Sequence, residues 1–438
     1  MRVFRFDMLL LAVLSVTLPV MAGIAAGSCP ALPPPVGRIV TVSTVPQLVT
    51  AVNTALPDTT ILIADGTYFL NGAYLWLDVP RVTLRSASGS RDAVVLDGGY
   101  QTTDVVSAVA SDVTVADLTI RRAYNHAVHV MSTTEGSADR VRVYNLHIED
   151  PGQQAVKVNP VPGGYYTDSG LVACSVIELT DAGRPHIRDN CYTGGIDIHQ
   201  SRDWVIQDNR IEGFWCPAGL SEHGIHLWVT CRDPVVERNL LRNNARGIGL
   251  GMALSGSGRT YPDSVCPGTS GYVDHFRGTI RNNFVSADDP DLLASADGFD
   301  CGICLWNACG ASVFHNTVYT ADPAATFSAI EWRFPNTGVQ LANNLVNDVL
   351  RQRDGAAATQ SGNLSGAQSG WFQAAGAGDL HLTALATAAI DQVSLPAGMA
   401  DDYDGQTRPI GPMADAGADE YGVSPAPAVS LYLPLILR

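Results

Sequence analysis

The stretch HGIHL (223–227) is one copy of a five-residue phrase that recurs along the chain. The other copies are HAVHV (126–130), QAVKV (154–158), GGIDI (194–198), RGIGL (246–250), CGICL (301–305) and SAIEW (328–332). In every copy the second position is Gly or Ala and the third is Val or Ile, whereas the fourth position varies. Apolar residues at alternate positions over so short a run predict β-strands with one buried face.

A second phrase alternates with the first and carries a small polar residue at its turn. These turn residues are Asp117, Asn145, Ser175, Asn209, Asn239, Asn283, Asn316 and Asn344. Asn suits a short bend because it adopts the left-handed conformation and can hydrogen-bond its own backbone. Successive turn residues lie between 28 positions (Asp117 to Asn145) and 44 positions (Asn239 to Asn283) apart.

Short strands and a turn repeated at this period predict an all-β fold, a single-stranded parallel β-helix. The chain then forms one long domain, because stacked coils bury one continuous apolar column. A β-sandwich or a β-propeller fits less well, since the repeat is too short for a four-stranded blade.

The repeats resemble those of right-handed parallel β-helix proteins, the superfamily that includes pectate lyases and many other carbohydrate-active proteins. The segment VPQLVTAVNTALPDTTILIADGTYFL (45–70) is similar to the start of that fold, a short helix, then a strand and a D-G-T-Y turn. The resemblance covers residues 38–422 and implies a right-handed β-helix with an N-terminal helical cap and an irregular C-terminal cap. It leaves the activity open, because this architecture hosts lyases, hydrolases, epimerases and adhesins.

Both ends of the chain carry segments expected to lie outside the β-helix. Arg2 and Arg5 precede an apolar run that leads into small residues, which predicts a secretory signal peptide over residues 1–26. A membrane anchor, or a lipid anchor at Cys29, is the weaker alternative. Residues 423–438 form a Pro-rich linker and the tail LYLPLILR, which is similar to short sorting or attachment signals and could equally be a docked strand. We expect a secreted or cell-surface monomer with no transmembrane helix once the signal is removed.

Charge and cysteine content narrow the class of protein. The formal net charge of −16 argues against nucleic-acid binding, which needs a basic face. Export places thiols in an oxidising compartment, where disulfides persist. Eight cysteines follow Cys29, namely Cys174, Cys191, Cys216, Cys231, Cys266, Cys301, Cys304 and Cys309. They allow up to four disulfides in about 105 connectivities, among which the sequence does not choose.

The fourth position of the five-residue phrase is expected to face solvent, since the third and fifth positions face the core. Read along the chain, it gives His129, Lys157, Asp197, His226, Gly249, Cys304 and Glu331. The neighbouring outward column gives Met131, Asn159, His199, Trp228, Gly251, Trp306 and Arg333. Long insertions flank the same coils, as the walls of a cleft would, and they favour function over a merely decorative ladder.

We predict that this face binds an anionic polysaccharide and cleaves it by β-elimination next to a uronate. Lys157 is the only lysine in the chain and the best candidate base, because lysine can lose its proton and arginine cannot. The other predicted catalytic residues are His226, Arg246 as the partner of the uronate, and Asp197. The predicted substrate-binding residues are His199, Asn159, Trp228, Trp306, Glu222 and His223.

Asp197 is also a predicted ligand for Ca²⁺, together with Asp297 and Asp300, since that ion prefers oxygen donors. Some lyases of this superfamily carry a lysine base on a strand of the β-helix, and QAVKVNP (154–160) resembles that arrangement. Those lyases have an arginine on the following coil, where this chain has Asp197. An exposed salt bridge between Lys157 and Asp197, worth at most about 1 kcal/mol, is the competing interpretation.

Three other functions stay open. Glycoside hydrolysis would use the carboxyl pair Asp197 and Glu222. A transition-metal centre would use His199, His226 and Cys304. A non-catalytic glycan-binding module would need the tryptophans alone. The sequence also predicts a structural pair between Glu331 and Arg333, and favours a solvated turn over a calcium loop at DDYDG (401–405).

Overall fold

The computed structural model describes residues 29–263 and 265–422. The predicted signal peptide (1–26) and the predicted linker and tail (423–438) lie outside the described residues. Within the described ranges, no helix combines the length and the apolar character needed to cross a membrane.

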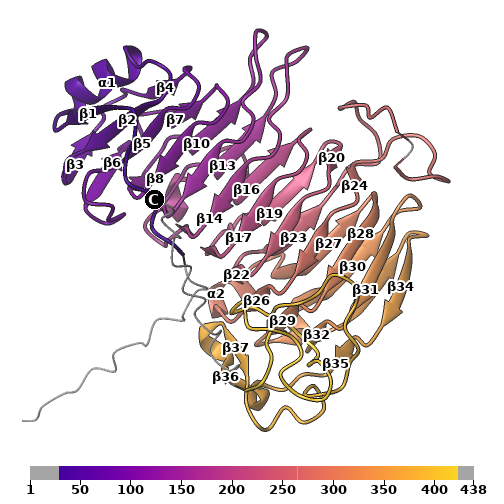
Figure 1. The fold of residues 1–438 in the computed structure, drawn as a ribbon. Helices are drawn as coiled ribbons and strands as arrows, with labels where there is room; N and C mark the ends of the chain where they lie inside the picture. Colours follow the sequence, from indigo (N-terminus) through magenta and orange to yellow (C-terminus); the bar gives the residue numbers. More distant parts are fainter. Residues whose placement is uncertain (1–28, 264, 423–438) are drawn as a thin grey trace, which may run out of the picture.

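The chain winds into a right-handed parallel β-helix whose coils stack along one axis (Figure 1), which confirms the predicted fold. Each regular coil contributes one strand to each of three parallel sheets. The front sheet carries the five-residue phrases and consists of β4 (Leu75–Leu77), β7 (Asp104–Ala108), β10 (His126–Met131), β13 (Gln154–Asn159), β16 (Gly194–His199), β19 (His223–Trp228), β23 (Arg246–Leu250), β27 (Phe299–Trp306), β30 (Thr326–Arg333) and β33 (Leu350–Arg353).

The other two sheets complete the coils. The second sheet consists of β1 (Arg38–Val42), β2 (Thr59–Ile63), β5 (Thr83–Ser86), β8 (Thr114–Ala116), β11 (Arg142–Tyr144), β14 (Leu171–Ala173), β17 (Val205–Gln207), β20 (Cys231–Arg232), β21 (Val235–Glu237), β24 (His275–Phe276), β25 (Thr279–Arg281), β28 (Ala308–Phe314), β31 (Gly338–Ala342) and β34 (Ala357–Ser361). The third sheet consists of β3 (Gly66–Phe69), β6 (Val94–Asp97), β9 (Thr119–Arg121), β12 (His147–Glu149), β15 (Val176–Glu178), β18 (Arg210–Glu212), β22 (Leu240–Arg242), β26 (Phe284–Ala287), β29 (Thr317–Thr320), β32 (Leu345–Val346) and β35 (Leu364–Ser365).

The short helices and the last two strands lie outside these sheets. The helices are α1 (Val45–Asn53), α2 (Pro290–Leu293), η1 (Arg184–His186), η2 (Pro323–Ala325), η3 (Ser369–Trp371) and η4 (Ala375–Ala377). Strands β36 (Phe372–Ala374) and β37 (Asp379–Leu382) form an antiparallel pair. Thr44 precedes helix α1 as its N-cap, and its side chain accepts a hydrogen bond from the Gln47 amide. The helix buries Leu48 against the first coil. The predicted helical cap is thus confirmed.

The composition of the five-residue phrase follows from the packing. Its third and fifth positions are fully buried in the core, as Ile225 and Leu227 illustrate. The backbone of the next coil passes close to the second position: a Cβ atom on Gly195 would lie 2.3 Å from the carbonyl oxygen of Gly224. Gly195 therefore has to be glycine, and the copies that carry alanine bury it, as at Ala127 and Ala155, so the position leaves no room for a larger side chain.

The turn phrase contains a buried asparagine ladder, which corrects one detail of the sequence prediction. Asp117 and Asn145 adopt the left-handed conformation themselves, but in later coils the residue before the predicted turn residue does so, as Asp208 does before Asn209. The predicted residue then points inward. The side-chain amide of Asn209 donates to that of Asn239 (3.0 Å), and the chain of bonds continues through Asn283, Asn316, Asn344 and Asn363. The left-handed position and the ladder position are therefore different residues.

Four disulfides join described cysteines: Cys29–Cys174, Cys191–Cys216, Cys266–Cys309 and Cys301–Cys304. The number of bridges agrees with the upper limit of four that the sequence sets. That limit counted the eight cysteines after Cys29, whereas one bridge uses Cys29 and none uses Cys231. Cys29 belongs to the disulfide framework, so the alternative of a lipid anchor on its thiol is wrong, and Cys231 is left as a buried free thiol.

The irregular C-terminal cap folds back over the outer face of the third sheet (yellow in Figure 1). Phe284 of β26 stacks on Tyr403 of the cap with ring centroids 3.9 Å apart. The DDYDG turn is held by Asp402, whose carboxylate accepts hydrogen bonds from the backbone amides of Asp404 and Gln406. This internal use of the carboxylate fits the predicted turn.

The cap should lose stability as the pH rises. Burial raises the pKa of Asp402 and Asp415 to about 6 and that of Asp419 to about 7. Burial disfavours the charged form of His381, but Asp379 and Asp404 outweigh it and raise its pKa to about 10. All four groups bind more protons when folded than when unfolded, the carboxyls above their ordinary pKa of 3.8 and the histidine above 6.5.

We therefore expect the free energy of cap opening to fall by at least about 2 kcal/mol between about pH 5 and pH 8. Hydrogen exchange of β37, corrected for the intrinsic pH dependence, measures this. The strands of the front sheet serve as the internal control and should show a smaller change. Protection of β37 that stays constant or rises over this range would contradict the prediction.

Candidate active site

The predicted ladder is present in the front sheet. The parallel register pairs His129 with Lys157, Lys157 with Asp197, and Asp197 with His226. It continues through Gly249, Cys304 and Glu331 and extends the column to Trp76 and Ser107 on the N-terminal side. One five-residue phrase per coil was therefore sufficient to align these residues correctly.

The ladder is outward of the core but it is not solvent-exposed, which corrects the prediction. The exposed fraction is 8% for Lys157, 1% for Asp197 and zero for His226. The insertions fold down onto the ladder: the ring of Tyr192, from the segment before β16, reaches Lys157, and Cys191–Cys216 ties that segment to the next insertion. Burial removes the ion pair from water, so the bound of about 1 kcal/mol for an exposed salt bridge does not apply.

Lys157 is the centre of a compact polar network. Its Nζ lies 2.5 Å from Asp197 Oδ2, 3.2 Å from Tyr192 Oη and 3.1 Å from His199 Nε2. Asp197 Oδ1 in turn accepts the Trp228 indole N–H (2.8 Å) and lies 3.2 Å from His199 Nε2. The three donors of the ammonium group and both carboxylate oxygens thus have partners within one cluster.

The network shifts the pKa of Asp197 and that of Tyr192 in opposite directions. Burial alone would raise the pKa of the Asp197 carboxyl, but Lys157 and His199 hold it well below its usual range. Burial and the charges of Asp197 and Glu222 raise the pKa of Tyr192, so its hydroxyl stays protonated and can donate. The sequence analysis missed Tyr192, because it lies in an insertion whose path no periodicity fixes.

A second cluster lies one coil further along the front sheet. Glu222 Oε2 lies 2.9 Å from His226 Nδ1 and 3.5 Å from His223 Nδ1. Burial would raise the pKa of the Glu222 carboxyl, yet His223 and His226 lower it strongly. Burial lowers the pKa of His223 to about 3. His226 stacks on Trp228 with centroids 5.1 Å apart, so the two clusters are in direct contact.

Arg246 and Trp306 are engaged within the protein. Arg246 Nε donates to Asp300 Oδ2 (2.7 Å) and its guanidinium lies 4.9 Å from the centroid of Trp306. Trp306 is buried and donates its indole N–H to Glu331. Neither side chain presents a free surface to a ligand in this conformation.

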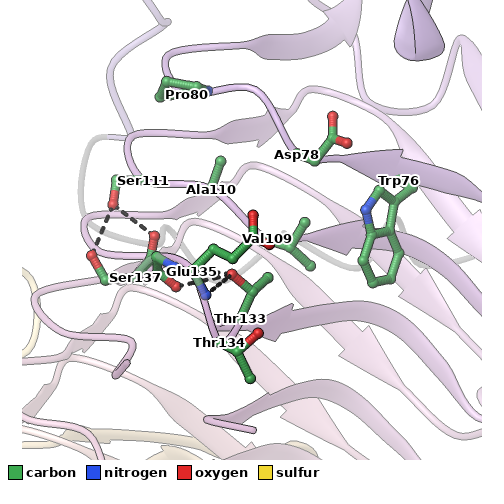
Figure 2. A pocket seen from close by; sticks show the side chains of 11 residues that line it. Trp76, Asp78, Pro80, Val109, Ala110, Ser111, Thr133, Thr134, Glu135 and Ser137 are labelled. Carbon is green, nitrogen blue, oxygen red and sulfur yellow. Dashed lines mark hydrogen bonds between the residues drawn. The ribbon is translucent and has the colours of Figure 1, made fainter. Parts of the chain in front are cut away.

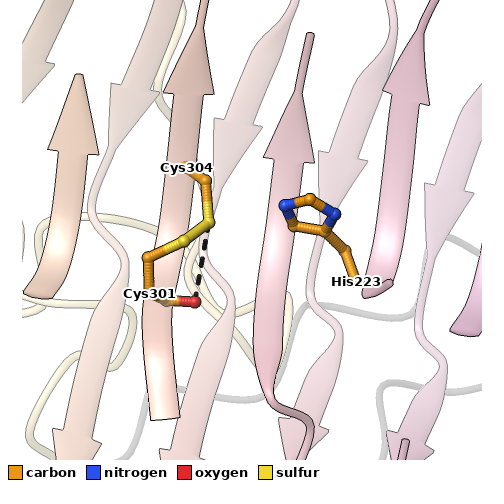
Figure 3. Close-up of side chains that lie close together, drawn as sticks. All are labelled: His223, Cys301 and Cys304. Carbon is orange, nitrogen blue, oxygen red and sulfur yellow. Dashed lines mark hydrogen bonds between the residues drawn. A yellow bond between two sulfur atoms is a disulfide. The ribbon is translucent and has the colours of Figure 1, made fainter. Parts of the chain in front are cut away.

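The predicted calcium ligands do not come together. Asp197 is paired with Lys157 and Asp300 with Arg246, whereas Asp297 is exposed. Their carboxylates do not form one of the groups of metal-binding side chains among the described residues. The proposed set of His199, His226 and Cys304 does not form either: Cys304 is in a disulfide with Cys301 next to His223 (Figure 3), which removes the thiolate.

The predicted pair of Glu331 and Arg333 is also wrong. Each residue has its partner in or beside the next strand, β33: Glu331 binds Arg353 (3.2 Å) and Arg333 binds Asp354 (2.8 Å). Neighbouring coils offer partners at closer range than residues two apart along one strand.

The N-terminal end of this face is accessible. Two depressions, of about 680 and 800 Å³, meet at Trp76, which is 38% exposed; Figure 2 shows the first, bounded by the segment that contains Glu135. The second is lined by Tyr74, which is 60% exposed, and by Asp104. Exposed rings beside polar groups suit the apolar faces of sugars.

Behind the second depression lies a cluster that the sequence analysis did not assign. Asp104 Oδ2 lies 3.0 Å from His129 Nδ1, and His126 is adjacent, with its ring centroid 5.0 Å from that of His129. His129 also contacts Asn159, one of the predicted substrate-binding residues (2.8 Å). The two histidines of HAVHV were the available signal, but strict alternation turns the first position inward with the third and fifth, whereas the structure brings the rings of His126 and His129 together.

No protein-family model matches the chain, and no curated protein matches it in sequence. Solved structures do resemble it. The pectate lyase Pel9A is 13% identical, covers 85% of this chain and 90% of its own, and gives a TM-score of 0.49. An alginate lyase from Paenibacillus sp. str. FPU-7 is 17% identical, covers 74% of this chain and 99% of its own, and gives 0.43. A polygalacturonase from Erwinia carotovora is 11% identical, covers 78% and 96%, and gives 0.34. These likenesses concern the fold alone.

Proposed function

We propose that the protein is a secreted polysaccharide lyase that cleaves an acidic glycan by β-elimination at the front sheet. The observation that carries the proposal is the network around Lys157, in which an amine, a phenol and an imidazole meet within hydrogen-bonding distance. Elimination beside a uronate needs a base for the proton next to the carboxylate and an acid for the leaving oxygen.

The carboxyl groups favour elimination over hydrolysis. A glycoside hydrolase needs one carboxyl that stays protonated, with a raised pKa, beside a second that is ionised. Asp104, Asp197 and Glu222 all have lowered pKa values, because histidines or Lys157 stabilise their charged forms. The predicted hydrolytic pair of Asp197 and Glu222 therefore lacks its acid.

Lys157 acts as the base once its ammonium proton has moved to His199 Nε2, 3.1 Å away. Asp197 Oδ1, 3.2 Å from that nitrogen, stabilises the resulting imidazolium. The free amine takes the proton next to the uronate carboxylate, the C–H electron pair forms the C=C bond, and the C–O bond to the leaving sugar breaks. Tyr192 donates its proton to the leaving oxygen and regains one from the Lys157 ammonium at 3.2 Å. No water is consumed.

The test is a screen of pectate, alginate and glycosaminoglycans for the ultraviolet absorbance of an unsaturated uronate. New absorbance on one acidic glycan, and none on neutral glycans, supports the proposal. New reducing ends without that absorbance would replace elimination by hydrolysis.

A non-catalytic glycan-binding protein is the second candidate, and the exposed rings of Tyr74 and Trp76 favour it. Binding of a glycan without any product, lost in Trp76→Ala, would support this candidate against the lyase.

A further inference from the structure

We propose that Asp104, His126 and His129 bind a divalent transition-metal ion such as zinc, with one coordination position open to the depression beside Tyr74 and Trp76. The site spans β7 and β10, whose parallel register places His126 opposite Asp104. One ligand atom from each of the three side chains lies within 4.8 Å of the other two. Two imidazoles and a carboxylate are a donor set that zinc favours.

The neighbours of the two rings leave one lone pair on each ring for the metal. His126 Nδ1 lies 2.9 Å from the backbone carbonyl of Gln154, which only accepts, so this nitrogen carries the hydrogen and Nε2 keeps its lone pair. His129 Nε2 lies 2.8 Å from Oδ1 of Asn159. The amide of Asn159 is oriented by its own bond to the Pro160 carbonyl (3.3 Å), so Nε2 of His129 is the donor and Nδ1 the acceptor.

His129 Nδ1 and Asp104 Oδ2 are therefore two acceptors that face each other at 3.0 Å. Two acceptors repel at this distance unless a cation or a proton lies between them. Zinc bonds of about 2.0–2.2 Å in a tetrahedral site place neighbouring ligand atoms about 3.3–3.6 Å apart, so a small outward movement of one side chain would admit the ion. Carbonyl acceptors on the far nitrogens are also the usual means of orienting metal-binding histidines. The competing account is that a proton on His129 Nδ1, and no metal ion, lies between His129 and Asp104.

The site is open on one side. The side chains of Asp104 and His129 retain 21% and 13% of their exposure, and Asp104 borders the depression of about 800 Å³. In the cluster of Glu222, His223 and His226, by contrast, both histidine side chains are fully enclosed. Three protein ligands and an open position are typical of catalytic zinc, and the open position would take water or a glycan oxygen.

The register gives the site a further role, which rests on the proposed function. His129 is paired with Lys157 on the adjacent strand, so a bound cation would neutralise a uronate carboxylate one coil from the base. Metal binding itself is measured without glycan, so it stands or falls independently of β-elimination.

The experiment is calorimetric titration of the chelator-stripped protein with Zn²⁺, with Co²⁺ absorption spectra as a second reading of nitrogen ligation. We expect one ion per chain at this site, with binding lost in His126→Gln and His129→Gln. Asn159→Leu should weaken binding by about 10- to 100-fold, because Asn159 only orients a ligand. His147→Gln is the matched control: His147 forms a similar pair with Glu178 (2.7 Å) on the third sheet and should leave the titration unchanged.

Thermal unfolding of each variant separates loss of the site from loss of the fold. Absence of Zn²⁺ and Co²⁺ binding by the folded wild-type protein would overturn the proposal, and would assign the proton between Asp104 and His129 to an imidazolium. Binding that survives both His126→Gln and His129→Gln but disappears in His223→Gln would also overturn it, by placing the ion at the enclosed cluster.

Discussion

Replacing Lys157 by arginine is expected to lower kcat for elimination by at least about 100-fold while the protein stays folded. Arginine keeps the positive charge beside Asp197 but cannot lose its proton, so the ion pair survives and the base does not. The initial rate of unsaturated-uronate formation on the glycan identified by the screen measures the effect. Thermal unfolding of the variant shows whether the network still forms.

Arg85→Lys is the reciprocal control. Arg85 forms a buried pair with Asp117 (2.7 Å) on the second sheet, with side-chain exposures of 10% and 4% that match the 10% and 1% of Lys157 and Asp197. This exchange should leave kcat unchanged. A Lys157→Arg variant that keeps most of its kcat would remove the base assignment and leave Lys157 as a structural ion pair.

Replacing Asn283 by alanine is expected to lower the free energy of unfolding by about 3 kcal/mol or more. Asn283 Oδ1 accepts from the backbone amide and from the side chain of Asn239, both at 3.0 Å. Its Nδ2 donates to Asn316 (2.9 Å) and to the Val236 carbonyl (2.9 Å). The substitution removes the side-chain acceptor of the buried Asn239 backbone amide and interrupts the ladder between Asn239 and Asn316. Urea unfolding followed by circular dichroism measures the cost.

Asn363 gives the matched comparison, because it is half-buried at the end of the described ladder. Asn363→Ala should cost clearly less than Asn283→Ala, since water reaches the groups that it leaves unpaired. Equal costs at the two positions, or a cost below about 1 kcal/mol at Asn283, would show that the ladder does not stabilise the fold as argued.

The sequence predicted the solenoid and the alignment of the ladder because both depend on local periodicity. One phrase per coil fixes which residues of the front sheet lie side by side, as with Lys157 and Asp197. Whether those residues reach solvent depends instead on the insertions. Tyr192 covers Lys157 from a segment without any repeat, so neither its contact nor the burial of the ladder follows from the pattern.

Two other errors have similar physical origins. The left-handed position is Asp117 itself in an early coil, but it is Asp208, one residue before the predicted Asn209, in a later coil. Asn209 lies in the ladder instead, and the sequence does not separate the two positions because both residue types suit a bend. The position of Cys29 just after the predicted signal peptide raises a lipid anchor as an alternative, yet Cys29 pairs with Cys174 across 145 residues. Contacts of such range leave no trace in spacing.

The central claim is that the protein breaks a glycosidic bond without adding water. Digestion of the responsive glycan in ¹⁸O-labelled water, followed by mass spectrometry of the products, tests it most directly. Elimination predicts products whose summed mass equals that of the parent chain, with an unsaturated non-reducing end and no ¹⁸O incorporated by the cleavage itself. One ¹⁸O atom per bond broken, beyond the slow exchange of a control sugar, would contradict β-elimination and establish hydrolysis.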